Sequence, residues 1–549
     1  MDGNLSATGS LYLINPAGVA IGPSGRVQTG GSFTASTLDI PDQDFLDGGD
    51  NTFSGSSTAT VVNAGAIGSL GGDITLIARK VTNNGTLSAP NGTAALAAGT
   101  EVLVLDKAQA DGGHILVKVG GADDAVTNSG RIAAAVAELR ANGGNVYALA
   151  GNTGGTVSAT GTAIRDGRIL LTAGKDGTTE VSGTLQARKG TDGSASGGTI
   201  VATGGAVHLT GTAKLDASGA AGGTILVGGD YQGGRDPATK TQDGVITTAR
   251  TTTVDKGAVL TADSTAGKGG TVVVWSDEKT GFEGAISARG TGQGGGGGTA
   301  EVSGKAVLAY KGTTDLTAEN GQTGTLLLDP HNLTITTDAK AGDGTSATYD
   351  NSGLKVSTLE NALGTANVIV STGSTGTQAG DIVVDSDVTW ATNTLTLQAA
   401  GNIRLNKSLT GTNNAGLVLD YGTGKGYVLH IGAKINLAGT GASLTIGGTG
   451  YTLIQDKAGL DSIGIDTAKL SGNYALAGDL DLSGSHIFRG RYRRRYERIQ
   501  GDLRRVGASD PAGAPSPAAG SRTPNTPMPG DQFPTPRPWI RSEDPPTTF

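Results

Sequence analysis

Short β-prone runs repeat along the chain between about residues 60 and 330, and this repetition constrains the fold more than any single motif. The pattern Val-x-Asn-x-Gly-x-(Ile/Leu) occurs at 61–67, 81–87 and 126–132. A Gly-Gly pair opens a β-rich run at positions 71, 112, 143, 197, 222, 269 and 297. The intervals between these pairs fit one or two turns of a coil whose turn is roughly 20 to 27 residues long.

The runs have the residue pattern of half-buried strands. Asp73–Ile77, Thr271–Trp275, Asn332–Thr336 and Thr394–Leu397 are rich in β-branched residues, and several alternate apolar and polar side chains. A single coil cannot bury its apolar side, but coils stacked about 4.8 Å apart enclose a narrow continuous core. The sequence therefore predicts an all-β fold, a right-handed parallel β-helix of about twenty coils with Val, Ile, Leu and Ala inside.

The Asn and Gly residues at fixed places in the first repeat suggest a role at the corners of the coils. Both residue types accept the left-handed backbone conformation, and Asn side chains of successive coils can form a ladder of amide hydrogen bonds. The alternative is that these residues are ordinary surface turns.

Composition is that of an extracellular structural protein. The chain has 94 Gly among 549 residues, 16% charged and 4% aromatic residues, and no Cys. The absence of Cys excludes thiolate nucleophiles and Cys-ligated metal sites. Residues 1–486 carry a net charge of −13 and residues 487–549 a net charge of +5. An acidic body argues against nucleic acid as the main partner, because phosphate binding needs clustered cations.

Two apolar runs near the N-terminus end in turns of Asn, Pro, Gly and Ser. The first turn is Asn15-Pro16-Ala17-Gly18, the second is 22–25, and Ala35-Ser36-Thr37-Leu38-Asp39 follows. This order resembles the second half of the export domain of filamentous-haemagglutinin-type exoproteins of two-partner secretion systems. That family has Asn-Pro-Asn-Gly, then Phe-Gly-x-x-Gly, then Ala-Ser-Thr-Leu-Asp. The chain departs from the pattern at Ala17, where the family has Asn, and at Ile21, where it has Phe.

Later segments are also similar to segments of large haemagglutinin-like exoproteins, in the family's order. They cover the chain to about residue 485 and lie at 227–233, 272–278, 286–290, 301–305, 324–335 and 473–482.

The resemblance implies a route and a role. It implies export by an outer-membrane β-barrel transporter with periplasmic domains, a secreted or cell-surface location, and adhesion to a host-cell or glycan receptor. It also implies that Asn15, Pro16 and Gly18 form an export-recognition turn; the alternative is an ordinary solenoid corner. The first residues lack a signal-peptide pattern, so we expect the chain to begin inside the export domain.

The chain divides into four predicted parts. Residues 1–60 are the C-terminal part of the export domain, 61–330 a β-helical repeat region, and 331–486 further solenoid repeats. Residues 487–549 form an Arg- and Pro-rich tail, which we expect to be disordered and which reads like a frameshifted sequence. No run of about 18 apolar residues exists, so no membrane-spanning helix is expected.

Catalytic and metal-binding signals are poor. The histidines show no ligand spacing, and they are His114, His208, His331, His430 and His486. Gly290–Gly295 matches Gly-x-Gly-x-x-Gly, but no helix pattern follows it. The best carboxylate cluster is Asp381, Asp385 and Asp387, with the last two expected on one face of a strand. Solvated turn residues explain this cluster equally well.

Three classes of function remain. The first, which we favour, is an adhesin-like exoprotein that is not an enzyme and has no cofactor or metal site. The second is a β-helical carbohydrate-active enzyme, a polysaccharide lyase or hydrolase. The third is the stalk of a contact-dependent toxin, which would need a C-terminal effector domain.

Overall fold

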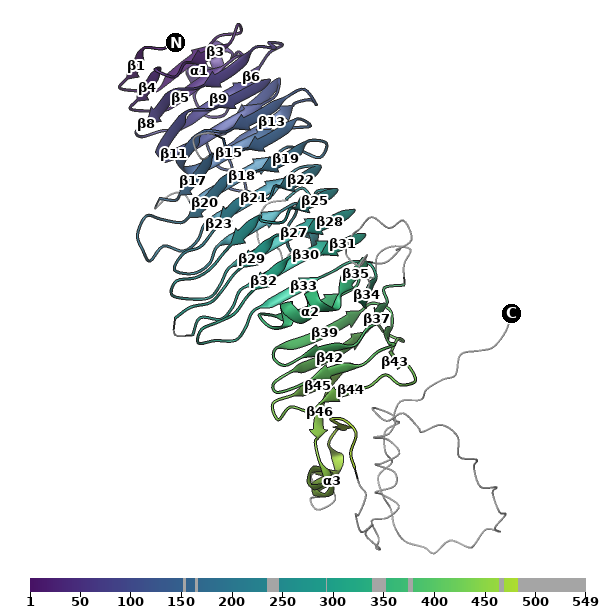
Figure 1. Ribbon diagram of the computed structural model, residues 1–549. Coiled ribbons are helices and arrows are strands. Elements are labelled where there is room, and N and C mark those ends of the chain that lie inside the picture. Colours follow the sequence, from purple (N-terminus) through teal and green to yellow (C-terminus); the bar gives the residue numbers. More distant parts are fainter. Residues whose placement is uncertain are drawn as a thin grey trace, which may run out of the picture. The chain divides into compact units, whose positions relative to one another are not determined.

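The computed structural model describes residues 1–151, 155–162, 166–234, 246–292, 294–337, 352–373, 379–463 and 469–481. Nearly all regular structure in these ranges is β-strand (Figure 1). The helices are α1 (Asp42–Asp47), α2 (Val356–Leu363), α3 (Lys457–Ile463) and the 3-10 turns Tyr231–Gly234 and Lys469–Ser471. The tail predicted at 487–549 lies outside the described residues.

The strands form three parallel faces, and up to β33 each complete coil gives one strand, or half of a long strand, to each face. The first face contains β1 (Asn4–Ala7), β4 (Arg26–Thr29), β8 (Ala66–Ser69), the first halves of β11 (Thr86–Ala98) and β15 (Arg131–Ala141), β17 (Thr156–Thr160), β20 (Thr184–Arg188), β23 (Lys214–Asp216), β26 (Val259–Thr261), β29 (Ala285–Ser287) and β32 (Thr313–Asp315). The coil closes because the corners between faces are rich in Gly, Asn and Asp.

The second face runs through the whole stack. It contains β2 (Leu11–Ile14), β5 (Phe33–Ser36), β9 (Ile74–Ala78), the second halves of β11 and β15, β18 (Arg168–Thr172), β21 (Thr199–Thr203), β24 (Thr224–Val227), β27 (Thr271–Ser276), β30 (Thr299–Gly304), β33 (Thr325–Leu328), β36 (Asn367–Ser371), β39 (Thr394–Ala399), β42 (Gly416–Tyr421) and β45 (Ser443–Ile446).

The third face is a ten-stranded sheet. It contains β3 (Val19–Ile21), β7 (Thr60–Asn63), β10 (Lys80–Asn83), β14 (Ala125–Asn128), β16 (Asn145–Ala148), β19 (Thr178–Val181), β22 (Ala206–Leu209), β25 (Thr251–Val254), β28 (Lys279–Phe282) and β31 (Val307–Tyr310). One apolar cluster of Val, Ile, Leu and Ala fills the space between the faces from Val19 to Ala475. These findings confirm the predicted all-β parallel β-helix.

The coils are fewer and more unequal than predicted. Asn83 and Asn128 are direct register partners, so the 45-residue repeat interval is a single coil enlarged by an insertion. Thr224 pairs with Thr271, so the interval between the Gly-Gly pairs at 222 and 269 is also one coil. The second face therefore has fifteen strands among the described residues, and the prediction of about twenty coils was wrong.

The predicted reason for Gly at the corners was also wrong. None of Asn63, Asn83 and Asn128, and none of the glycines two residues after them, has a positive φ. A Cβ on Gly85 would lie 2.1 Å from the carbonyl oxygen of Gly65 in the preceding coil. Gly is therefore required here because the backbones of successive coils stack closely. A left-handed backbone conformation is not the reason.

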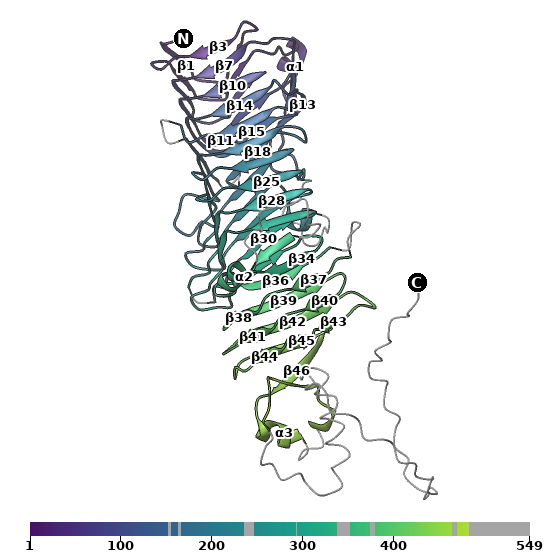
Figure 2. The same ribbon diagram turned by 45° about the vertical axis from the view of Figure 1, so that its right-hand side comes forward.

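Two insertions cover the outer side of the second face near the N-terminus. They contribute β6 (Asn51–Ser54), β12 (Glu101–Val104) and β13 (Ile115–Val119), which form a small antiparallel sheet outside the coils (Figures 1 and 2). Beneath it lies a second apolar cluster that includes Leu38, Phe53, Ile77 and Val102.

The coil changes after β33. The first-face position between β32 and β38 is taken by α2, whose Val356, Leu359, Ala362 and Leu363 are buried at helical spacing. The third-face position passes to β35 (Ser352–Lys355), β34 (Leu333–Thr336), β37 (Ile382–Val384), β40 (Ile403–Leu405) and β43 (Tyr427–Leu429).

Here β34 lies between β35 and β37, out of chain order. The remaining strands are β38 (Val388–Trp390), β41 (Leu409–Gly411), β44 (Ile435–Leu437), β46 (Thr449–Ile454) and β47 (Tyr474–Leu476). The divisions expected at residues 60, 330 and 486 stay predictions.

Candidate functional site

The turn at Asn15 joins β2 to β3 at the corner between the second and third faces. The Asn15 side chain is used within the turn, because its Nδ2 donates to the Gly18 carbonyl at 2.9 Å and its Oδ1 accepts from the Ala17 N–H at 3.1 Å. The Gly18 N–H donates to the Asn15 carbonyl at 2.9 Å and closes the turn. Gly18 has a φ of 109°, a conformation that residues other than Gly rarely adopt.

Two hydrogen bonds hold the turn from outside, and the rest of it is open to solvent. The Asn15 N–H donates to the Ser36 carbonyl at 2.9 Å. The Ser57 hydroxyl donates to the Pro16 carbonyl at 2.6 Å. Asn15, Pro16 and Ala17 are exposed. The structure therefore brings the three predicted residues together in one rigid, solvent-facing corner. An ordinary solenoid corner accounts for the internal hydrogen bonds equally well.

The Ala-Ser-Thr-Leu-Asp motif directs the chain out of the coil. Ser36 Oγ accepts from the Leu38 N–H at 2.9 Å and donates to the Leu38 carbonyl at 2.7 Å. Leu38 is buried under the outer sheet, and Asp39 forms a bridge with Ser54 at the end of β6. The motif thus starts the insertion that carries α1 and β6.

The carboxylates suspected of catalysis are engaged in the corners of the C-terminal coils. Asp381 is ion-paired with Arg404 at 3.2 Å, Asp385 accepts from the Asn406 amide at 2.6 Å, and Asp387 accepts from the Ser408 N–H at 2.8 Å. The expectation that Asp385 and Asp387 share one face of a strand was wrong, because both lie in the corner between β37 and β38. These contacts tie one coil to the next, as solvated turn residues do.

The other weak motifs lie apart. His208 on the third face is 2.9 Å from a carboxylate oxygen of Asp255, while the His114 ring lies 3.2 Å from the Leu105 carbonyl. In the ranges that the structure describes, no three His, Asp or Glu side chains form a group able to hold a metal ion. Gly290–Gly295 belongs to the connection between β29 and β30, and a strand, not a helix, follows it.

Several of the family-like segments meet on the outer side of the second face. The segment after β24, from Gly228, folds back over an apolar patch formed by Leu170, Val201, Leu226, Val273 and Trp275. We call this segment, residues 228–234, the cover. A Cβ on Gly229 or Gly233 would lie 2.6 or 2.9 Å from the Trp275 indole, so the cover can pack closely only because both residues are Gly.

A buried carboxyl anchors the cover. Glu301 on β30 has no exposed surface, and its Oε2 accepts from the Gln232 N–H at 2.7 Å. Burial raises the pKa of Glu301 to about 8, which the Gln232 N–H opposes and nearby Asp329 and Asp230 reinforce. Sequence reasoning did not assign this anchor. A glutamate between Ala300 and Val302 in a β-prone run was the available signal.

A second buried carboxyl anchors the N-terminal insertion. Glu138 on β15 accepts from the His114 N–H at 2.6 Å and from the Ile115 N–H at 3.2 Å. Arg140 pairs with Glu138 at 2.9 Å and with Asp111 at 3.0 Å. Burial would raise the pKa of Asp111, but Arg140 lowers it below its ordinary value.

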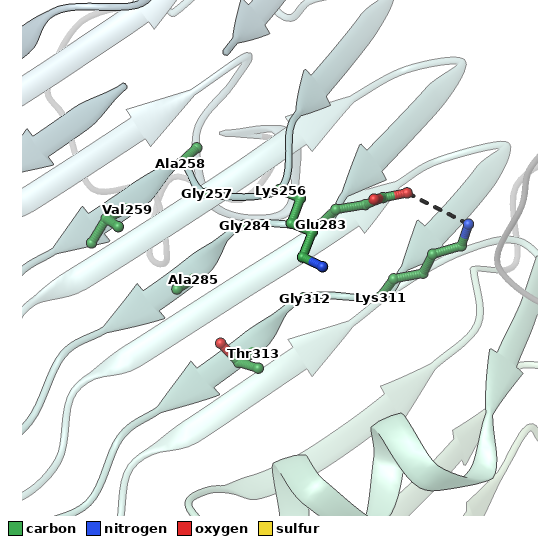
Figure 3. Close-up of a pocket in the computed structure, with 10 residues that line it drawn as sticks. All are labelled: Lys256, Gly257, Ala258, Val259, Glu283, Gly284, Ala285, Lys311, Gly312 and Thr313. Carbon is green, nitrogen blue, oxygen red and sulfur yellow. Dashed lines mark hydrogen bonds and ion pairs between the residues drawn. The ribbon is translucent and has the colours of Figure 1, made fainter. Parts of the chain in front are cut away.

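A shallow groove of about 450 Å³ runs along the corner between the third and first faces (Figure 3). Three successive corners line it with Lys256, Glu283 and Lys311, and Lys311 lies 3.5 Å from Glu283. Its floor is made of corner glycines, and a Cβ on Gly312 would lie 2.3 Å from the Gly284 carbonyl. Coil stacking explains these glycines, so the groove by itself assigns no ligand.

Comparison with known proteins bears on the N-terminal third of the chain. Residues 1–187 match the family model of the TPS secretion domain. A search of curated proteins finds no match. The crystal structure of the HMW1 secretion domain from Haemophilus influenzae is 27% identical, with 60% of this chain and 82% of that chain covered and a TM-score of 0.44.

The described part of the chain contains no helix long and apolar enough to cross a bilayer. The secretion-domain match covers the Asn15 turn, the Ala-Ser-Thr-Leu-Asp motif and the outer sheet. Residues 1–187 therefore match a two-partner-secretion domain, and together with the family-like motifs in order this match supports a two-partner secretion exoprotein of the filamentous-haemagglutinin type.

Proposed function

We propose that this chain is an adhesin-like β-helical exoprotein, secreted or held at the cell surface, and that an outer-membrane β-barrel transporter with periplasmic domains exports it. The observation that carries this proposal is the secretion-domain match over residues 1–187. A Gly-rich chain without Cys can pass a pore unfolded, and each coil that folds outside offers its edge strands to the next coil.

The proposed recognition element is the corner formed by Asn15, Pro16 and Gly18. It is supported by the exposure of Asn15 and Pro16 and by the fixed geometry of the turn. Since the Asn15 amide is used inside the turn, the transporter would contact the Pro16 ring and the shape of the backbone. Asn15 and Gly18 would act as positioning residues.

Export in the presence of the transporter tests this proposal. The chain is placed behind a signal peptide and co-expressed with its partner transporter, and the exported chain is measured in the medium. We expect Asn15→Ala and Pro16→Ala to lower the secreted amount severalfold. Asn15→Asp should act more mildly, because it keeps the acceptor for the Ala17 N–H.

The next corner of the same coil supplies a matched control. Pro23 is also an exposed proline in a solenoid turn, so Pro23→Ala should leave export unchanged. Refolding of each purified variant separates export from stability. Equal secretion of the Pro16 and Pro23 variants would assign Asn15 to Gly18 to an ordinary corner.

Adhesion is the second part of the proposal and rests on the family resemblance. A β-helix offers long ladders of exposed side chains rather than a deep pocket, which suits binding spread over many weak contacts. Beads coated with the purified chain should bind host cells or immobilised glycans above beads coated with a β-helix from outside this family. Equal binding of both sets of beads would contradict the adhesive role.

A further inference from the structure

The insertion beside the Asn15 turn carries an apolar pair that the fold leaves uncovered. Phe45 and Leu46 on α1 are 47% and 76% exposed. No residue of α1 is buried, and the helix has no side-chain hydrogen bond at its N-terminal cap. Large apolar side chains left in water forgo part of the free energy that their burial would supply. The fold therefore gains little from this pair in the isolated chain.

The sequence around the pair is acidic. Between Arg26 and Arg79 the sequence contains no Lys or Arg, but it contains six Asp. Asp42, Asp44 and Asp47 lie on α1 itself, and none of the three takes part in an ion pair. The Asp106 N–H donates to Asp50 at 2.9 Å, and the exposed Lys107 follows Asp106 in the sequence. An acidic border with one such cation nearby, around an exposed apolar pair, is complementary to an apolar pocket bordered by Lys or Arg.

This surface is continuous with the proposed recognition corner. The Phe45 ring contacts Tyr12 of β2 edge to face, with ring centroids 5.0 Å apart. Tyr12 lies three residues before Asn15, and the same insertion supplies Ser57, which binds the Pro16 carbonyl. Figures 1 and 2 show α1 at the end of the stack that holds β1 to β5. A partner that binds the corner can therefore reach α1 as well.

We propose that the segment 41–50, with Phe45 and Leu46 at its centre, is a docking surface for the transporter's periplasmic domains, and that its occupant is an apolar pocket bordered by basic residues. This inference rests on the proposed function and adds the place and chemistry of the contact. Because the segment is contiguous in sequence, it could be bound before the coils form.

Direct binding tests the inference. The purified chain is titrated with the purified periplasmic region of its partner transporter, at low and high salt. Phe45→Ser combined with Leu46→Ser should weaken binding at least tenfold, as loss of a central apolar anchor does. Asp42→Asn, Asp44→Asn and Asp47→Asn together should flatten the salt dependence. Leu70→Ser is the matched control, because Leu70 is 62% exposed in the same domain.

The outcomes separate the inference from the proposed function. Loss of binding in the Phe45/Leu46 variant, with normal binding of the Leu70 variant and unchanged circular dichroism, supports the inference. Wild-type binding by the Phe45/Leu46 variant, with weakened binding by Pro16→Ala, overturns the inference and leaves the export corner standing. No binding of the unmodified chain overturns both.

Discussion

Asn83 donates a hydrogen bond from its side-chain Nδ2 to Oδ1 of Asn128, 2.7 Å away, although 45 residues separate them in the sequence. Asn63 donates in the same way to Asn83 at 2.8 Å, and all three side chains are buried. The ladder ends where register places Ile21 on one side and Ala148 on the other. It joins three coils of the secretion domain at one corner.

Removing the middle of this ladder should destabilise the N-terminal coils. Asn83→Ala leaves the buried Asn63 Nδ2 with only a long hydrogen bond to the Thr86 carbonyl, at 3.4 Å, and removes the donor to the buried Asn128 Oδ1, so we expect a loss of about 2 to 4 kcal/mol in unfolding free energy. Asn84→Ala should cost below about 1 kcal/mol, because Asn84 is exposed. Urea unfolding, with hydrogen exchange of the β10 amides, measures both. Equal effects would mean that the ladder is not a stabilising element.

The buried ion pair under the outer sheet should be sensitive to the loss of one partner. Glu138→Ala leaves Arg140, which is 8% exposed, without its nearest carboxylate and frees the 114–115 N–H groups. We expect a destabilisation of about 3 to 5 kcal/mol. Asp166→Ala is the control, because Asp166 is exposed and its pair with Arg168 is long, at 3.4 Å. Thermal unfolding measures the difference, and similar midpoints for the two variants would contradict this role.

Glu301 should make stability fall as the pH rises. Its pKa is about 8 in the fold and about 4.3 in an unfolded chain, so the folded state holds an extra proton between these values. Its favourable contribution is complete below about pH 4.3 and is lost as the pH approaches 8. Glu301→Gln keeps a neutral acceptor for the Gln232 N–H. The stability of the variant relative to the wild type should therefore increase as the pH rises from 5 to 9.

Thermal midpoints across this pH range measure the gain. The control is Glu283→Gln, whose carboxylate is half-exposed at the corner beside Lys311. Its difference from the wild type should not change in this way. Parallel pH curves for the wild type and Glu301→Gln would show that the buried carboxyl is charged in the fold.

The cover should open when Gly233 gains a side chain. Gly233 has a φ of 72°, and a Cβ there would lie 2.9 Å from the Trp275 ring. Gly233→Ala should therefore expose Trp275, now 1% exposed, to acrylamide quenching. The measurement uses a background in which Trp390 and Trp539 are Phe. Gly426→Ala has free space for its Cβ and should leave quenching unchanged. An unquenched Gly233 variant would show that the cover adapts.

The fold class could be predicted from the sequence because it depends on local patterns. Alternation in runs such as 394–397 fixes which side chains point inward, and recurrence of the runs requires stacking. Insertions could not be predicted in the same way. The 45-residue step between Asn83 and Asn128 looks like two turns in the sequence, and only pairing in space shows that it is one.

The sequence by itself determined the β-helix, its apolar interior and the secretion-domain motifs, because each depends on residues close together in the chain. Tertiary structure alone decided that Glu301 lies under the cover, that Asp385 and Asp387 form hydrogen bonds in a corner, and that α2 replaces a strand. Those outcomes depend on register between distant segments, which is set by how coils of unequal length stack.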